Sequence, residues 1–172
     1  MGQNPVHIET NHDLYHTAMA EFDGSDSAAG SDDMVWWSAT ETAARVAART
    51  VSAVDVTDAH LARVAAVNGD INAITRVNPH ARAEAEAVDR AVTQGRELAL
   101  AGVPVTIKDN VDVAGQTTPN GVPALDIMVA ASDAPLVENL RAAGAVILGR
   151  TNTPEFSWRW HTDNPLFGPT LN

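Results

Sequence analysis

From Ser38 onward, the apolar and polar positions of the chain follow helical spacing. Ser38 and Glu41 form a capping-box pattern that opens an alanine-rich helix. Ser52 and Asp55 open a second helix in the same way, and its apolar residues return near one face. Asn68-Gly69 is expected to end this second helix, because both residue types favour helix termini.

Three short apolar runs interrupt the helical pattern and predict strands. Residues 71–74 alternate between apolar and polar, and residues 103–107 form a run with proline near its start. Residues 145–148 are wholly apolar, which is typical of a strand buried on both faces. Helical patterns over 79–95 and 136–144 separate these strands, so the sequence predicts an α/β fold with parallel strand pairing.

The first 33 residues differ from the rest of the chain. They contain seven acids and neither lysine nor arginine, so they carry −7 of the net charge of −11, and residues 34–172 carry the remaining −4. Residues 22–33 are small, polar and acidic, and bury too little apolar surface to offset the entropy of ordering. We therefore expect a disordered tail over 1–33 and one globular unit over 34–172.

Charge and composition exclude several classes of partner and of chemistry. A net charge of −11 gives no basic face for phosphates, so we expect neither nucleic acid nor an anionic membrane surface as a partner. Absence of cysteine excludes disulfides, thiolate nucleophiles and cysteine-based zinc sites. No run approaches about 18 consecutive apolar residues and no signal-peptide pattern is visible, so a cytoplasmic protein is predicted.

Histidines in the tail offer one possible metal site. His12 and His16 are four residues apart with an aspartate between them, and His7 lies upstream, which resembles a zinc-protease pattern. Short histidine-bearing segments are common in solvated tails, so a solvated tail is the favoured interpretation. We predict no metal and no cofactor.

Lys108 is the candidate catalytic residue. It is the single lysine among eleven cationic residues, and it directly follows the apolar run 103–107. The carboxyl end of a buried strand is where α/β folds place ligands. A desolvated amine loses its proton near neutral pH and a guanidinium does not. The alternative is an ordinary solvated lysine.

Two tryptophans near the end of the chain are a second candidate for a functional role. Trp158 and Trp160 flank Arg159, which is available for a cation–π contact. Packing in the core or at an interface is favoured over a substrate wall.

Several runs with fixed spacing together resemble the amidase signature family, over about residues 34–172. The resemblance implies the family's α/β fold, of which this chain would hold the N-terminal helices and part of a mixed, largely parallel sheet covered by helices. The matching runs are Leu100–Asn110, Thr117-Thr118, Asp133–Val137, Leu140–Ala145, Gly149–Asn152 with Glu155-Phe156, and Asn164-Pro165 with Phe167–Thr170 and Asn172.

The resemblance implies an amide hydrolase that acts on a small-molecule amide through a nucleophilic serine, a second serine in a cis peptide, and a lysine matched by Lys108. That lysine must be withdrawn from water to act as a base. Residues 153–160 depart from the sequence typical of the tRNA amidotransferase subunit, which favours a general amidase.

The family's glycine- and serine-rich segment is expected after Asn172. We therefore expect the N-terminal part of an amidase, inactive alone, whose partner is a C-terminal fragment or a homodimer mate. The alternative is a non-catalytic chain that binds a partner through apolar surface.

Overall fold

The structure is a computed structural model, and it describes residues 31–172. The expected tail over 1–33 lies almost wholly outside the described residues and stays a prediction, as does the interpretation of His7, His12 and His16. Ten elements follow one another along the described chain: α2 (Ser31–Met34), α3 (Ala39–Ala47), α4 (Ala53–Ile71), β1 (Ile74–Val77), α5 (Ala81–Thr93), β2 (Pro104–Lys108), the 3-10 turn η2 (Pro123–Leu125), α6 (Pro135–Ala142), β3 (Val146–Thr151) and the 3-10 turn η3 (Glu155–Ser157).

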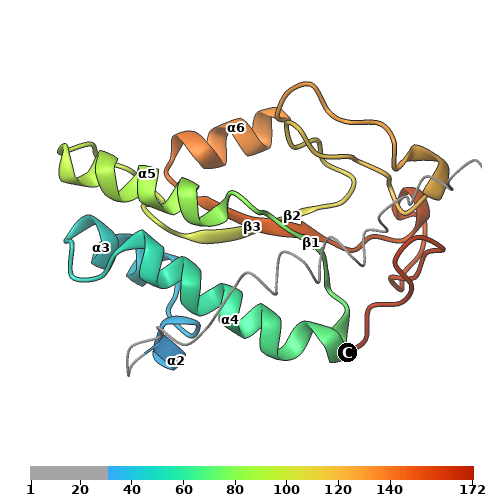
Figure 1. Ribbon diagram of the computed structural model, residues 1–172, viewed down its shortest axis with the longest axis horizontal. Helices are drawn as coiled ribbons and strands as arrows, with labels where there is room; N and C mark the ends of the chain where they lie inside the picture. Colours follow the sequence, from blue (N-terminus) through green and yellow to red (C-terminus); the bar gives the residue numbers. More distant parts are fainter. Residues whose placement is uncertain (1–30) are drawn as a thin grey trace, which may run out of the picture.

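A three-stranded sheet lies between helices on its two sides (Figure 1). The strand order is β1-β3-β2, in which β2 runs parallel to β3 and β1 runs antiparallel to it. This arrangement confirms the predicted α/β fold with a mixed sheet. In the part of the chain that the structure describes, no helix is both long and apolar enough to cross a bilayer.

The alternation of side chains along β3 creates two apolar cores. Val146 and Leu148 face the core formed with α3, α4 and α5, whereas Ile147 packs against Val137 of α6 on the opposite face. Successive residues of a strand point to opposite faces, so a strand covered on both sides needs consecutive apolar residues. The expectation that residues 145–148 are buried on both faces is confirmed.

Helix α4 ends later than the sequence predicts. Both Ser52 and Asp55 make the expected capping-box contacts, but the helix continues through Gly69 to Ile71. It ends at Asn72, whose φ of 54° lies in the left-handed region. Strand β1 is displaced by a similar amount and begins where the sequence pattern predicts the end of a strand.

The buried amide of Asn68 contributes to the turn that follows α4. Its Oδ1 accepts the backbone N–H groups of Ala73 and Ile74 at 3.0 and 2.7 Å, and its Nδ2 donates to the Ile74 carbonyl at 2.9 Å. Asn68 therefore satisfies the backbone of the turn after the helix instead of ending the helix. It joins α4 to the edge strand β1.

Helix α5 also starts later than expected. The sequence pattern predicts a helix from residue 79, but Ala81 is the first helical residue and His80 occupies the cap position. The Asn78 amide instead donates to the Ile147 carbonyl at 2.8 Å and to Glu84 at 2.9 Å. Asn78 thus ties the start of α5 to the central strand, which local spacing does not reveal.

Replacement of Gly149 by alanine should destabilise the sheet. An added Cβ at this position on β3 would lie 2.2 Å from the Arg76 carbonyl oxygen of β1, so the two strands must separate. We expect Gly149→Ala to lower the free energy of unfolding by about 1–3 kcal/mol, measured by urea denaturation. The matched control is Gly69→Ala in α4, where an added Cβ meets nothing within 4 Å and should raise stability by about 0.5–1 kcal/mol. Equal effects of the two variants would contradict this packing.

Candidate active site

Lys108 is the last residue of β2, so its expected position at the carboxyl end of a strand is confirmed. Its side chain is exposed among the described residues, which differs from the expected withdrawal from water. The amine donates a hydrogen bond to the Ser157 Oγ at 3.1 Å. The described residues therefore orient the Lys108 amine but do not desolvate it.

The Ser157 hydroxyl lies at the centre of a polar cluster. Besides the Lys108 amine, its Oγ contacts Asn110 Nδ2 at 3.0 Å and Thr153 Oγ1 at 3.0 Å. Ser157 and Phe156 have φ values of 61° and 49° in the turn η3. Left-handed backbone is costly for residues other than glycine, so this turn must be held by its surroundings.

Two backbone hydrogen bonds connect the end of β2 to the turn η3. Asn120 N donates to the Asp109 carbonyl at 3.2 Å, and Phe156 N donates to the Asn120 carbonyl at 3.0 Å. On the other side of the turn, the buried amide of Asn164 donates to the Thr153 carbonyl at 2.8 Å. These contacts bring residues almost fifty positions apart into one site.

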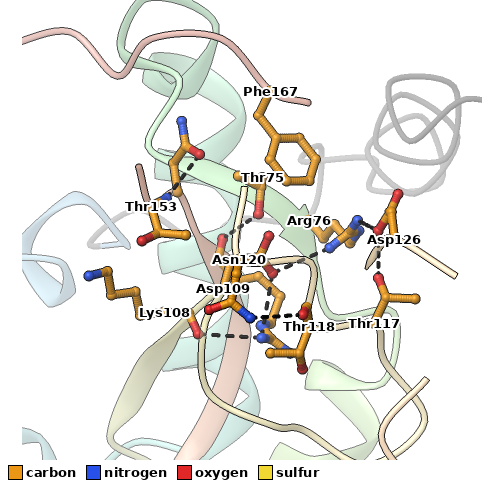
Figure 2. A network of polar contacts seen from close by, with 12 residues as sticks. Thr75, Arg76, Lys108, Asp109, Thr117, Thr118, Asn120, Asp126, Thr153 and Phe167 are labelled. Carbon is orange, nitrogen blue, oxygen red and sulfur yellow. Dashed lines mark hydrogen bonds and ion pairs between the residues drawn. The ribbon is translucent and has the colours of Figure 1, made fainter. Parts of the chain in front are cut away.

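A buried network of ion pairs lies behind Lys108. Asp109 Oδ1 is 3.3 Å from Arg76 Nη1 and 3.4 Å from Arg150 Nη2. Figure 2 shows Arg76 between Asp109 and Asp126, with which it also pairs, and shows the Lys108 amine pointing away from this network. Arg76 and Arg150 face each other across β1 and β3, so Asp109 offsets the repulsion between two guanidinium groups.

Arg150 also binds the backbone on either side of Asp109. Its Nη2 donates to the Val111 carbonyl at 2.7 Å and to the Lys108 carbonyl at 3.3 Å. Arg150 and Asp109 are both fully buried. The guanidinium thereby fixes the backbone from which the Lys108 side chain leaves.

Burial changes the protonation of Asp109. Loss of water raises the pKa of this carboxyl from 3.8 to about 6, although the charges of Arg76 and Arg150 act in the opposite direction. Its Oδ2 has no hydrogen-bond partner among the described residues, which also disfavours the ionised form.

The exposed aromatic residues at the end of the chain do not join the described core. Trp158 and Trp160 are 86% and 106% exposed, and Phe156 is 54% exposed. Arg159 lies 3.3 Å from Glu155. The prediction that the tryptophans pack in the core is therefore wrong within residues 31–172. Packing at an interface and a role as a substrate wall both stay predictions.

Sequence reasoning missed Ser157 and Arg150. Ser157 gave no signal, because the residue types of its turn do not reveal a left-handed conformation. Arg150 could have been found as a charged residue that extends an apolar run.

Over residues 31–172, no three histidine, aspartate or glutamate side chains are grouped as metal ligands.

Comparison with known families identifies the class of protein. The Amidase family profile matches residues 55–172, which include all three strands and every residue of the polar cluster. The chain therefore belongs to the amidase family, known from its signature sequence as the amidase signature family.

Individual relatives agree with this assignment. An indoleacetamide hydrolase of Bradyrhizobium diazoefficiens is 51% identical over 80% of this chain, which covers 27% of that protein. A glutamyl-tRNA(Gln) amidotransferase subunit of Paenarthrobacter aurescens is 43% identical over 82% of this chain and 28% of its own length.

Among solved structures, a vestigial protein complex related to the origins of an s-triazine catabolic enzyme has a TM-score of 0.76. It is 40% identical, over 79% of this chain and 30% of that one. The chain thus spans less than a third of the length of these relatives.

The raised pKa of Asp109 predicts a pH dependence of stability. Between about pH 4 and pH 6 the unfolded chain loses the Asp109 proton while the folded chain keeps it, so rising pH favours unfolding. The free energy of unfolding of the parent, relative to Asp109→Asn, should fall by about 3 kcal/mol across this range and stay level above it. Urea denaturation at several pH values measures this difference. A difference that rises with pH would show that the arginines, not burial, control the carboxyl.

Proposed function

We propose that this chain supplies Lys108 as the catalytic base of an amidase that hydrolyses a small-molecule carboxamide. The observation that carries the proposal is the place of Lys108 at the carboxyl end of β2, with its amine held against the Ser157 hydroxyl. Membership of the amidase family supports the same reaction class. No cofactor enters this chemistry.

The proposed reaction converts an amide and water into a carboxylic acid and an amine or ammonia. The nucleophilic serine bonds to the carbonyl carbon while its proton moves to the bridging serine, whose own proton moves to the Lys108 amine. The proton then passes to the leaving nitrogen as the C–N bond breaks. Water cleaves the acyl-enzyme ester and releases the acid. Both serines belong to sequence outside these 172 residues.

Lys108 needs a less aqueous environment for this role. Its side chain is exposed among the described residues, whereas a lysine base has to be withdrawn from water. The segment that brings the serines would lie over the Lys108 amine and exclude water from it. Arrival of the serines and activation of the base would then be one event.

The substrate is proposed as a simple carboxamide rather than the amide donor of a tRNA-linked transamidation. Identity is 51% to the indoleacetamide hydrolase and 43% to the amidotransferase subunit. Residues 153–160, which depart from the pattern expected for the amidotransferase, contact the Lys108 amine through Ser157, whose hydroxyl also contacts Thr153. The departure therefore affects the site itself.

A second candidate function is that of a non-catalytic chain that binds a partner through apolar surface. Exposure of Phe156, Trp158 and Trp160 supports it, because three large apolar side chains lie close together in sequence beside the site. In this case, the 172-residue chain alone has no amidase activity.

Replacement of Lys108 tests the proposed base. In the amidase assembled from this chain and the serine-bearing polypeptide, Lys108→Ala should lower kcat for carboxamide hydrolysis by several powers of ten without unfolding the protein. Lys108→Arg is the matched control, since it keeps the charge but not an amine that can lose its proton. Both variants should be inactive. Undiminished turnover in either variant would contradict the role of base.

Mass measurement of the native material distinguishes the two candidate functions. We expect intact-mass analysis and native mass spectrometry to find the chain joined to, or associated with, a polypeptide that carries a glycine- and serine-rich segment. Amide hydrolysis should appear only in that material. A stable lone chain, with no serine-bearing partner and no turnover, would favour the binding function.

A further inference from the structure

We infer that Ser157 is a positioning residue for Lys108: its hydroxyl holds one N–H of the amine and thereby orients the lone pair that accepts the proton. This inference deepens the proposed function and rests on it. It concerns a serine that resembles neither of the two expected serines, because it lies in the turn η3 and outside any glycine-rich segment. Four side chains that meet at this hydroxyl form the Ser157 cluster: Lys108, Asn110, Thr153 and Ser157.

When Lys108 is an ammonium, the direction of every hydrogen bond in the Ser157 cluster follows from the chemistry of its groups. A hydroxyl offers one donor and two acceptor positions. The Lys108 amine and the Asn110 amide nitrogen both donate to Ser157 Oγ, at 3.1 and 3.0 Å, and fill its two acceptor positions. The Ser157 proton must then go to Thr153 Oγ1 at 3.0 Å. Thr153 in turn donates to the Pro154 carbonyl at 3.2 Å.

With Lys108 as an ammonium, this pattern does not present the Ser157 proton to the amine. Both of its lone pairs accept hydrogen bonds, and its proton lies on the side of Thr153 instead of the side of Lys108. A base activates a hydroxyl only when it receives the proton of that hydroxyl. Lys108 therefore acts on another group, and Ser157 acts on Lys108.

The contact suits both protonation states of the amine. An ammonium has three N–H donors, and a neutral amine has two N–H donors and one lone pair. One N–H remains on Ser157 in either state, so the amine does not rotate when it loses a proton. The lone pair then points away from Ser157, toward the open side of the site.

The surroundings of Ser157 restrain its hydroxyl, although the residue itself is exposed. Thr153 is fully buried, and its carbonyl accepts the buried Asn164 amide at 2.8 Å. Asn110 and Lys108 lie on the backbone fixed by Arg150 through the Lys108 and Val111 carbonyls. The left-handed turn at Ser157 is thus held from two sides, and a strained backbone that is held in this way is typical of functional sites.

Nuclear magnetic resonance of the single lysine tests the inference in the 172-residue chain. Incorporation of lysine labelled with ¹³C gives one ε-carbon signal, because Lys108 is the only lysine. In the parent chain the two ε protons should be inequivalent and the ε carbon should relax as an ordered group. In Ser157→Ala and Ser157→Gly the inequivalence should be lost and the side chain should become mobile.

The variants are chosen so that misfolding does not produce the same result. Glycine suits a φ of 61° better than serine does, so Ser157→Gly removes the hydroxyl and relieves the turn. Ser132→Ala, at an exposed serine in the loop before α6, is the matched control and should leave the Lys108 signal unchanged.

An unchanged Lys108 signal in both Ser157 variants would overturn the inference. Covalent labelling of Ser157 by a fluorophosphonate would also overturn it, because the hydroxyl would then be a nucleophile.

In the assembled amidase, both Ser157 variants should lower kcat on the order of 10- to 100-fold and leave KM nearly constant. Misorientation of a base affects the proton transfer and not substrate binding.

The experiments distinguish failure of the proposed function from failure of the positioning role of Ser157. Full turnover in Lys108→Ala rejects the proposed function while the resonance test still reports the Ser157 contact. An unchanged resonance rejects the positioning role even in an enzyme that needs Lys108.

Discussion

The buried pair of Asp109 and Arg150 is the interaction on which the site depends. Both side chains are fully buried, and charges without water are tolerated only when they are paired and hydrogen-bonded. Arg150 is paired through its Nη2 alone, which contacts Asp109 and two carbonyls of the chain at the end of β2 and just after it, while its Nε and Nη1 have no partner among the described residues. A charged residue in the centre of the sheet therefore sets the conformation of the loop that begins at Lys108.

The same loop separates two kinds of polar group. On one side the carboxylates and guanidinium groups form a network of ion pairs (Figure 2), and on the other side the Lys108 amine contacts the uncharged hydroxyl of Ser157. An ammonium next to a carboxylate holds its proton more strongly. Consecutive residues on a strand end point in different directions, so Lys108 and Asp109 remain apart although they are neighbours in sequence.

The elements could be predicted from the sequence because their signals are local. The capping residues Ser38 and Ser52 and the apolar run before Gly149 each depend on residues within a few positions. The carboxyl end of β2 could be predicted in the same way, because the apolar run 103–107 stops there. The position of Lys108 at that end follows from it. The shifted starts of β1 and α5 had another cause, since Asn68 and Asn78 bind groups on other elements.

The surroundings of Lys108 were less predictable than its position. Ser157 reaches the amine through a turn whose conformation no residue type in it favours, and the supports of that turn lie between residues 109 and 164. Desolvation of the amine could not be read from spacing either, because it depends on what packs over the residue. Local chemistry thus located the proposed base, and long-range contacts determine which groups its amine contacts.

The central place of β3 has a consequence for the order in which this fold can form during synthesis. Strands β1 and β2 emerge from the ribosome before β3, and within residues 31–172 each of them pairs with β3 alone. Until Val146–Thr151 has been made, the helices α4 and α5 can associate but both earlier strands keep unpaired backbone groups. The sheet therefore closes in one late step, and the site at the ends of β2 and β3 comes into existence with it.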